Sequence, residues 1–538
     1  MAFSTAAEFD EAYQTVHDTF ASGLTKNKEW RRQQLKRTWW MIEDNKDRIC
    51  AALYTDLHRH RYETGLADIA MLQNDILRTL EKMDEWTKDE KPTRWDMVNF
   101  MGGTRVRKEP KGVALIIGAW NFPFLLLLQP MVAAIAAGCA IILKPSDMAA
   151  ASQDLLMEII PQYLDLSAIR CISAGPQEMP HILEQRYDHI FYTGSGNIGK
   201  IVHAAAAKHL TSVTLELGGQ APAIVTAKAN IELSAKHIAA AKFTNAGQVG
   251  PLDQQIEAYL PKPQSTNKLT QVCLNVNHVV ADPTIREALV TNLIKYFDKF
   301  MGGRDTRPEY YTHIVNERNF DRLDRLLTST SGKIVYGGQR DRTTRFFAPT
   351  IVTDVKPGDS LLSEELFGPI LPIMDADLDF ALKYTRAGDR PLAIYPFTQS
   401  QIEKSRILDE TESGGVTFND CTLHFMARDA PFGGTGPSGQ GYYHGPYGIR
   451  EFSHLRTFVD GIPAWMEWLL DARYPPYSIE KLNKVAPAVK PSFDRDGNDT
   501  SLGLAKWVLG LGALVLSVAL VTPQQQVRSV FARLANRG

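Results

Sequence analysis

Apolar and polar positions follow two different patterns along the chain. Before about residue 95, apolar residues recur at spacings of three and four, as in LRTLEKMDEWTK (77–88), which predicts amphipathic helices. From residue 112 the apolar residues form short continuous runs that end at small or polar residues, such as GVALIIGAW (112–120) and AIILKPSD (140–147). Because helix-like segments separate these runs, they indicate strands of a parallel sheet that helices cover on both faces.

A second series of the same kind begins after residue 273, with runs such as LNVNHVVAD (274–282) and LAIYPFT (392–398). The chain is therefore predicted to be an α/β protein with two such parts. In open parallel sheets, ligands bind at the carboxyl ends of strands. The residues expected there include Trp120, Asn121, Lys144 and Glu216.

Composition limits the class of protein. The 538 residues carry a net charge of −2 and are 44% hydrophobic, which suits a large globular body of about two or three domains. This balance gives no electrostatic reason to expect nucleic acid as a partner. The five cysteines are scattered without zinc-ligand spacing, so neither a metal site nor a disulfide framework is predicted, and a reducing compartment is favoured. The N-terminus has the pattern of neither a secretory signal nor a transit peptide.

The C-terminal region differs from the rest. Residues 502–521, LGLAKWVLGLGALVLSVALV, carry one charge, Lys506, and as a helix would be about 30 Å long, enough to cross a bilayer. Trp507 would then lie near an interface. A buried core helix or a helix lying on a membrane stays open as an alternative. Residues 461–500 are Pro-rich and charged, as a linker would be. The arginines that follow residue 521 favour a C-terminus on the cytoplasmic side of the membrane. An ordinary tail anchor has the opposite orientation, so both orientations stay open.

Two motifs point to a nucleotide. FYTGSGNIGK (191–200) holds the pattern GxGxxG, with Gly194 and Gly199 at its ends, between a strand and a helix, where backbone can approach a diphosphate. Glycine turns without any ligand are also common at such junctions. Lys144 and Asp147 follow another strand and could bind the hydroxyls of a ribose, or simply form a surface ion pair.

Three residues have the chemistry of an acyl-forming oxidation. Glu216 lies between two leucines, and apolar surroundings would raise its pKa towards that of a general base, unless it is exposed to solvent. Asn121 could donate its amide to an oxyanion, or cap the following helix. Cys273 could be a nucleophile, or a cysteine packed in the core.

These motifs, together and in order, resemble those of the aldehyde dehydrogenase family over nearly all of residues 1–460. The short N-terminus and the apolar C-terminus resemble its class 3, fatty aldehyde branch. The segments that carry the resemblance are PKGVALIIGAWNFPF, CAIILKPSD, FYTGSGNIGK, TLELGG, FTNAGQ, EELFGPILPI, SGGVTFND and PFGGTGPSGQGYYHGPYG.

The resemblance implies a Rossmann-type cofactor domain, an α/β catalytic domain and a small oligomerisation segment of a homodimer. The expected boundaries are 1–214 for the N-terminal helices and cofactor domain, with about 89–107 belonging to the oligomerisation segment, 215–421 for the catalytic domain, 422–460 for the rest of the oligomerisation segment, 461–500 for the linker and 502–521 for the membrane anchor.

It also implies roles. Cys273 would attack the aldehyde, Asn121 and the backbone N–H of Cys273 would hold the oxyanion, and Glu216 would activate the water that releases the carboxylic acid. NAD, or NADP as in some class 3 members, would accept the hydride. The expected cofactor contacts are Lys144 and Asp147 with the adenosine ribose, Trp120 and Ser195 with the diphosphate, Glu365 with the nicotinamide ribose and Phe367 with the nicotinamide ring.

The sequence departs from the family pattern in three places. Gln220 stands where the family usually has lysine, and Asp147 stands where glutamate is commoner. The third departure is larger, since the family reads Asn-x-Gly-Gln-x-Cys without a break. Here residues 249–271 separate Gln248 from Cys273, and their removal restores FTNAGQVCLNVNHVV. Residues 249–271 can be encoded by a sequence with the features of a short intron, which would then have been translated in frame. The alternative is that these residues are a genuine insertion in the protein.

Three functions therefore compete. The first is membrane-anchored oxidation of medium- to long-chain aldehydes, with a cytosolic body on the endoplasmic reticulum, peroxisome or mitochondrial outer membrane. The second is a catalytically impaired nucleotide-binding or scaffold homologue, which the interruption before Cys273 favours. The third is a dehydrogenase of small aldehydes whose C-terminal tail only directs it to a membrane.

Overall fold

The computed structural model describes residues 3–92, 99, 102–248, 274–427, 429–461, 463–465, 467, 474–485 and 493–498. The chain divides into two compact units. One consists of Met1–Thr93 and Arg105–Phe458, and the other of Arg94–Thr104 and Val459–Gly538. The first unit holds both α/β sheets and all of the site described below.

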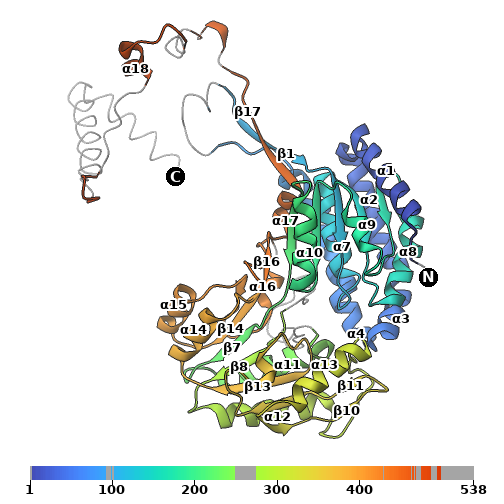
Figure 1. Cartoon of the computed structure of the whole chain (residues 1–538), viewed down its shortest axis with the longest axis vertical. Helices are drawn as coiled ribbons and strands as arrows, with labels where there is room; N and C mark the ends of the chain where they lie inside the picture. Colours follow the sequence, from blue (N-terminus) through green and yellow to red (C-terminus); the bar gives the residue numbers. More distant parts are fainter. Residues whose placement is uncertain are drawn as a thin grey trace, which may run out of the picture. The chain divides into compact units, whose positions relative to one another are not determined.

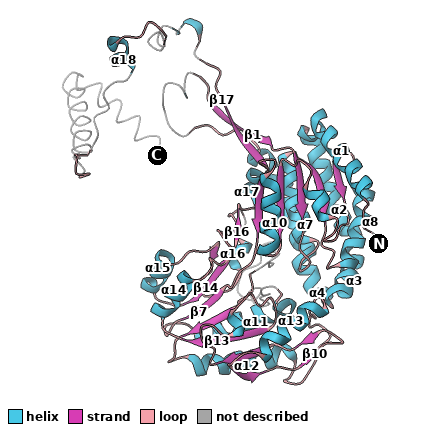
Figure 2. Ribbon diagram, in the orientation of Figure 1, coloured by secondary structure: helices cyan, strands magenta, loops and turns pink. Residues whose placement is uncertain are grey.

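Helices form the N-terminal part of the first unit, as the apolar spacing predicts (Figures 1 and 2). Thr5 and Glu8 form a capping box at the start of the first helix. The predicted stretch 77–88 falls largely within α5, which buries Leu72, Ile76 and Met83 on one face. The helices are α1 (Ala6–Ser22), α2 (Lys28–Asp44), α3 (Lys46–Leu57), α4 (Arg61–Thr64), a π-helical segment (Gly65–Ala70) and α5 (Met71–Trp86).

The first sheet has six strands in the order β16-β6-β5-β2-β3-β4. All neighbours are parallel except β16, which runs antiparallel to β6. The continuous apolar runs become its buried strands, so the predicted α/β fold is confirmed here. The elements are β2 (Val113–Ile117), α7 (Leu125–Ala137), β3 (Ala140–Lys144), α8 (Ala150–Tyr163), β4 (Ile169–Cys171), α9 (Met179–Leu183), β5 (His189–Thr193), α10 (Gly196–Ala207), β6 (Ser212–Glu216) and β16 (Gly439–Gln440).

The strand order of this sheet positions the site. From β2 the chain builds outward through β3 to β4, and then returns to place β5 on the other side of β2. The order therefore reverses between β2 and β5. A ligand crevice in an open α/β sheet is expected at the carboxyl ends of such a pair. The loops that leave these two strands begin with Gly118 and Gly194.

The second sheet has seven strands in the order β15-β14-β7-β8-β13-β12-β9. It is parallel except for β9, which pairs antiparallel with β12. Its elements are β7 (Pro222–Val225), α11 (Ile231–Phe243), a 3₁₀ segment (Thr244–Gly247), β8 (His278–Ala281), α12 (Arg286–Met301), α13 (Glu317–Thr328), β9 (Lys333–Tyr336), β12 (Thr350–Thr353), a 3₁₀ segment (Ser360–Leu362), β13 (Ile370–Asp375), α14 (Leu378–Ala387), β14 (Ala393–Phe397), α15 (Gln401–Glu410), β15 (Gly415–Val416) and α16 (Leu423–Met426). A separate two-stranded hairpin pairs β10 (Arg340–Asp341) with β11 (Phe346–Phe347).

A two-stranded ribbon pairs β1 (Arg105–Pro110) with β17 (Ser453–Phe458), antiparallel from Arg105 opposite Phe458 to Pro110 opposite Ser453. Figure 1 shows both strands extending from one end of the first sheet. Helix α17 (Gly445–Glu451) precedes β17 and packs on α7. The residues expected to form the oligomerisation segment thus include all of β17 and the beginning of β1, up to residue 107.

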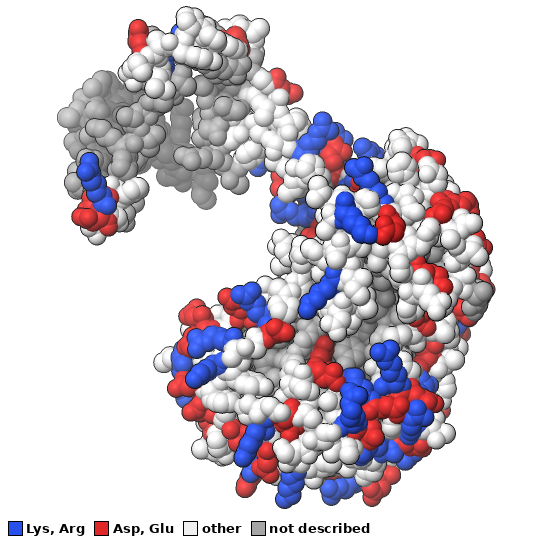
Figure 3. Space-filling view, in the orientation of Figure 1, with Lys and Arg blue, Asp and Glu red and all other residues white. Residues whose placement is uncertain are grey.

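The second unit contains one helix that the structure describes, α18 (Ile479–Val485), within the stretch expected to be a linker. The expected membrane anchor, 502–521, lies outside the described residues. Over the described ranges, no helix is both long and apolar enough to cross a membrane. On the face drawn in Figure 3, acidic and basic side chains are interspersed rather than gathered by sign.

Candidate active site

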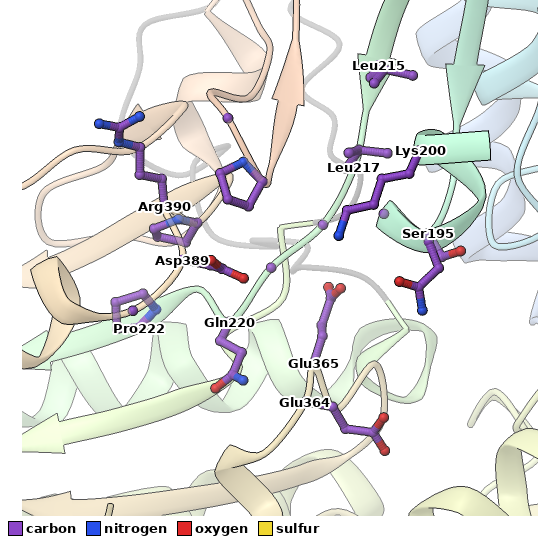
Figure 4. A pocket seen from close by; sticks show the side chains of 18 of the residues that line it. Ser195, Lys200, Leu215, Leu217, Gln220, Pro222, Glu364, Glu365, Asp389 and Arg390 are labelled. Atoms are coloured by element: carbon purple, nitrogen blue, oxygen red, sulfur yellow. The ribbon is translucent and has the colours of Figure 1, made fainter. Parts of the chain in front are cut away.

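A cavity of about 890 Å³ is lined by residues at the carboxyl ends of β5 and β6 in the first sheet and at the amino ends of β7, β8, β13 and β14 in the second. Figure 4 shows Ser195 and Lys200 on one side of it, Asp389 and Arg390 on the other, and Glu365 between them. Its wall also includes Gly196 and Asn197 of α10, Gly218, Gly219 and Gln220 after β6, and His278 of β8. The cavity is large enough for one nucleotide of a dinucleotide, and residues from both sheets line it.

The wall at α10 has the form of a diphosphate cradle. Ser195 precedes the helix with extended backbone, and its side chain makes no capping hydrogen bond. A Cβ at Gly194 would lie 2.3 Å from Tyr192 Oη, and one at Gly199 would lie 2.9 Å from a Leu217 methyl. Glycine at both positions therefore allows this close packing without displacing the Tyr192 and Leu217 side chains. The free N–H groups at the helix start suit a negatively charged group, as the GxGxxG motif predicts.

Lys144 and Asp147 lie together at the end of β3. Lys144 Nζ donates to Asp147 Oδ1 at 3.0 Å, and the Lys144 side chain is almost fully buried. The Lys144 carbonyl accepts a hydrogen bond from Gly118 N at 3.0 Å, which fixes it beside the loop that leaves β2. A buried ammonium and a partly exposed carboxylate at this edge fit the two hydroxyls of a ribose.

Glu365 projects into the cavity from the loop that precedes β13 (Figure 4). A Cβ at Gly218 would lie 2.2 Å from Glu365 Oε2, so glycine there makes room for the carboxylate. Burial raises the pKa of Glu365 to about 7, while a hydrogen bond from the Gly219 N–H and the charges of Arg322 and Lys242 oppose that rise. Arg322 also donates to the Glu365 carbonyl at 3.1 Å, which anchors the loop backbone.

Phe367, two residues further on, has left-handed backbone with φ 46°. Its ring packs edge to face on Trp120, with centroids 5.4 Å apart. Two predicted cofactor residues from different sheets therefore meet. This backbone conformation is energetically unfavourable for a non-glycine residue, and residues that adopt it are concentrated at functional sites.

Glu216 ends β6 and is 2% exposed. Within the described part of the chain, neither carboxylate oxygen has a hydrogen-bond partner. Burial, and to a lesser degree the charge of Glu451, raise the pKa of Glu216 well above its usual value. The expectation of a carboxylate in apolar surroundings is met, and such a group is suited to take a proton from water.

Asn121 follows β2 and is 1% exposed. Its Nδ2 donates to the Gln248 carbonyl at 3.3 Å, so the amide faces the loop that leads towards Cys273. Helix α7 begins at Leu125 and has no side-chain cap, so Asn121 does not cap it. The capping interpretation is therefore not supported, and the role of Asn121 as an oxyanion donor stays a prediction.

The expected nucleophile, Cys273, lies outside the described residues, as does the rest of 249–273. The two flanks of that segment are nevertheless held together, because Asn275 Nδ2 donates to the Gly247 carbonyl. Gln248 is fixed by a bond from its Nε2 to the His313 carbonyl at 3.0 Å and by one from Val315 N to its Oε1 at 3.1 Å. The chain thus leaves and re-enters the site at neighbouring points.

Several site residues escape sequence reasoning. Lys242 of α11 is fully buried; burial lowers its pKa to about 7, and within the described residues its Nζ has no hydrogen-bond partner. A lysine inside the apolar stretch AAAKF was the available signal. Arg59 and Asp68 form a fully buried ion pair beside Asn121, and nothing in the sequence indicated this pair.

Gln220, which the sequence showed in place of the usual family lysine, donates to the Leu362 carbonyl at 3.1 Å.

The crevice at the carboxyl ends of β5 and β6, the buried Glu216 carboxylate and the Asn121 amide have the features of an NAD(P)-dependent dehydrogenase site. The chain belongs to the aldehyde dehydrogenase family, whose model matches residues 1–251 and 262–458. It is therefore an oxidoreductase that oxidises aldehydes with NAD(P).

Relatives and solved structures agree with this assignment. Aldehyde dehydrogenase family 3 member B1 of Rattus norvegicus is 36% identical over 90% of this chain and 97% of its own. Beta-apo-4'-carotenal oxygenase of Neurospora crassa is 38% identical over 93% and 90%. The dimeric NADP-preferring aldehyde dehydrogenase of Rattus norvegicus is 36% identical over 87% and 98%. The substrate-bound AldH of Staphylococcus aureus is 31% identical, with TM-score 0.81, over 89% of this chain and 99% of its own.

Proposed function

We propose that this aldehyde dehydrogenase acts on medium- to long-chain aldehydes at a membrane surface, with Cys273, Asn121 and Glu216 as its catalytic residues. The observation that carries the assignment of roles is Glu216, buried at a strand end with both oxygens unbonded among the described residues. Burying a carboxyl group without partners lowers stability, and such groups are concentrated at functional sites.

In the proposed mechanism, Cys273 forms a covalent bond to the aldehyde carbon. The Asn121 amide, directed at the loop before Cys273, stabilises the oxyanion that develops. When bound, the oxidised nicotinamide accepts the hydride. Glu216 then takes a proton from the water that attacks the resulting thioester, and the carboxylic acid leaves.

The chain's own residues also suit the cofactor. The start of α10 would hold the diphosphate, Lys144 and Asp147 the adenosine ribose, and Glu365 the nicotinamide ribose. Phe367 would pack on the nicotinamide ring, and Trp120, which contacts Phe367, would lie near the diphosphate. Asp147 would accept a bond from a 2′-hydroxyl and repel a 2′-phosphate, which favours NAD, although one relative is named NADP-preferring.

The apolar sequence 502–521 supports the choice of substrate. Long-chain aldehydes partition into bilayers, so a site anchored there meets them at high local concentration. One relative is named for an apocarotenal, an apolar aldehyde. The proposed location is the cytosolic side of the endoplasmic reticulum, peroxisome or mitochondrial outer membrane.

Two features support a homodimer. The β1–β17 ribbon extends from the first sheet; the outer edge of β1 pairs with Glu90 at Val106, and β17 offers the other edge. Exposed strand edges are suited to pairing with another chain. A relative is also named as dimeric.

The rate of aldehyde oxidation is expected to depend on whether residues 249–271 are present in the protein. The family model leaves 252–261 unmatched inside an otherwise continuous match, which supports an interruption of the family sequence. The Asn275–Gly247 hydrogen bond brings the flanks close enough for a short direct connection. We therefore interpret the segment as a retained intron. If it stays in the protein, nucleophile placement suffers, because an error of about 1 Å can cost roughly a hundredfold in rate.

The test compares the full chain with a variant that lacks 249–271, and both with versions truncated after 460. Each is assayed on aldehydes of increasing chain length with NAD and NADP. We expect the variant that lacks 249–271 to have a higher kcat than the full chain. We expect truncation after residue 460 to lower kcat/KM on vesicle-bound long-chain aldehydes. An absence of turnover in both forms would favour the impaired homologue instead. Equal activity on small aldehydes with and without the tail would favour the small-aldehyde enzyme.

A further inference from the structure

Arg59 precedes His60, the N-cap residue of α4, and is fully buried. Its guanidinium contacts three segments that are distant in sequence. Nε donates to Asn245 Oδ1 at 3.1 Å, and Nη1 donates to Asp68 Oδ2 at 2.8 Å. Nη2 donates to the Asn121 carbonyl. One side chain thus joins the loop after β2 to the 3₁₀ segment that follows α11.

The same ion pair fixes the start of α7. Asp68 Oδ1 accepts a hydrogen bond from Leu125 N, the first residue of that helix, at 3.1 Å. The Arg59 guanidinium also lies over the Phe122 ring, 4.2 Å from its centroid. Residues 121–125 are therefore held at three points by Arg59 and Asp68, in a fork geometry that lysine cannot reproduce.

The second segment needs this support. Asn245 and Ala246 both have left-handed backbone, with φ 48° and 51°. Glu63 Oε1 accepts from Asn245 N at 2.7 Å, while Arg59 holds the Asn245 side chain. Three residues beyond Asn245, the Gln248 carbonyl accepts the Asn121 amide. Arg59 therefore bonds to residues on both sides of the Asn121–Gln248 contact.

Such a pair is expensive for stability alone. Desolvating two charges costs several kcal/mol, and apolar residues of similar size often serve a core as well. Burial lowers the pKa of Arg59 and raises that of Asp68 to about 6, although each charge opposes the shift of the other. We propose that Arg59, with Asp68, is a positioning residue that aligns the Asn121 amide with the nucleophile loop without touching the substrate. This inference rests on the proposed roles of Asn121 and Cys273.

The chain offers a matched control in Arg31, which is 7% exposed and, within the described residues, donates to the backbone carbonyls of Thr25, Lys26 and Ala136. Arg59→Lys and Arg31→Lys are compared in the full chain. We expect Tm to fall in both, but kcat to fall by about ten- to a hundredfold only in Arg59→Lys, with KM for aldehyde and cofactor changing little. Equal kcat losses at equal Tm losses would overturn the inference.

A second readout does not depend on turnover. In the full chain, Arg59→Lys should speed hydrogen exchange in peptides covering 117–128 and 243–248, and Arg31→Lys should leave those peptides unchanged. Unchanged exchange in both segments would refute the positioning role. Asp68→Asn keeps an acceptor for Leu125 N and should lower kcat in the same direction. The double variant should be no slower than Arg59→Lys alone, since the pair acts as one unit. Parent activity on aldehydes tests the proposed function separately.

Discussion

The two buried glutamates of the site lie in surroundings of opposite character. Glu216 has no hydrogen bond to either oxygen among the described residues, and its one charged influence is the like charge of Glu451. Glu365 accepts from the Gly219 N–H and has two cations, Arg322 and Lys242, in its field. Burial raises the pKa of both, and only Glu365 has a hydrogen bond and cations that oppose the rise. The comparison teaches that an unsupported carboxylate suits proton transfer, and a supported one suits binding.

The largest effect should come from Glu216→Gln, which keeps the shape and removes the base. We expect kcat to fall by about 10²–10⁴-fold, the range that a general base supplies. Thioester formation should survive, so rapid-mixing experiments should show a burst of NADH followed by little turnover. The exposed Glu184→Gln is the control and should behave as the parent. Steady turnover without a burst in Glu216→Gln would show that another group activates the water.

A smaller effect is expected for Glu365→Gln, because binding rather than chemistry is altered. A hydrogen bond to a charged group is worth about 1.5–3 kcal/mol, so cofactor Kd should rise by about ten- to a hundredfold. The pKa of Glu365 is about 7, so parent affinity should improve as pH rises through 7 and the carboxylate forms. Affinity of the variant should be flat across that range. Titration of cofactor fluorescence at several pH values measures both, and a pH dependence that survives in the variant would contradict the assignment.

The two glutamates also show what sequence can predict. Both lie in local motifs, TLELGG and EELFGPILPI, and the apolar run before Glu216 is enough to place it at a strand end. Strands β2 to β6 follow from similar runs. Strand β16 does not, since Gly439–Gln440 is too short to give a periodic signal and is fixed only by pairing with β6.

Contacts between residues that are far apart in the sequence could not be predicted from the sequence alone. Arg59 lies 62 residues from Asn121 and 186 from Asn245, and nothing in LHRHRY distinguishes it from its neighbouring basic residues. Helical periodicity places Lys242 on α11, but not its proximity to Glu365. The left-handed backbone of Phe367 likewise follows from the packing of its loop rather than from residue preference.

The smallest predicted effect tests the like-charge influence on Glu216. Glu451 Oε1 accepts from Thr214 Oγ1 at 2.7 Å, and Thr214 and Glu216 point to the same face of β6. Glu451→Gln keeps an acceptor for Thr214 but removes the negative charge, which is one cause of the raised pKa of Glu216. The pKa of Glu216 should therefore fall, and the base should stay ionised to lower pH.

In the kcat–pH profile, the acid limb of Glu451→Gln should move to lower pH, while the plateau stays near the parent value. His189, which lies 3.1 Å from Thr214 Oγ1 through Nε2, and Lys111, 3.2 Å from His189 Nδ1, face the same network. Burial keeps the pKa of His189 well below its usual value, so it stays neutral where the limb is measured. An acid limb that does not move, or moves to higher pH, would mean that burial alone sets the proton affinity of Glu216.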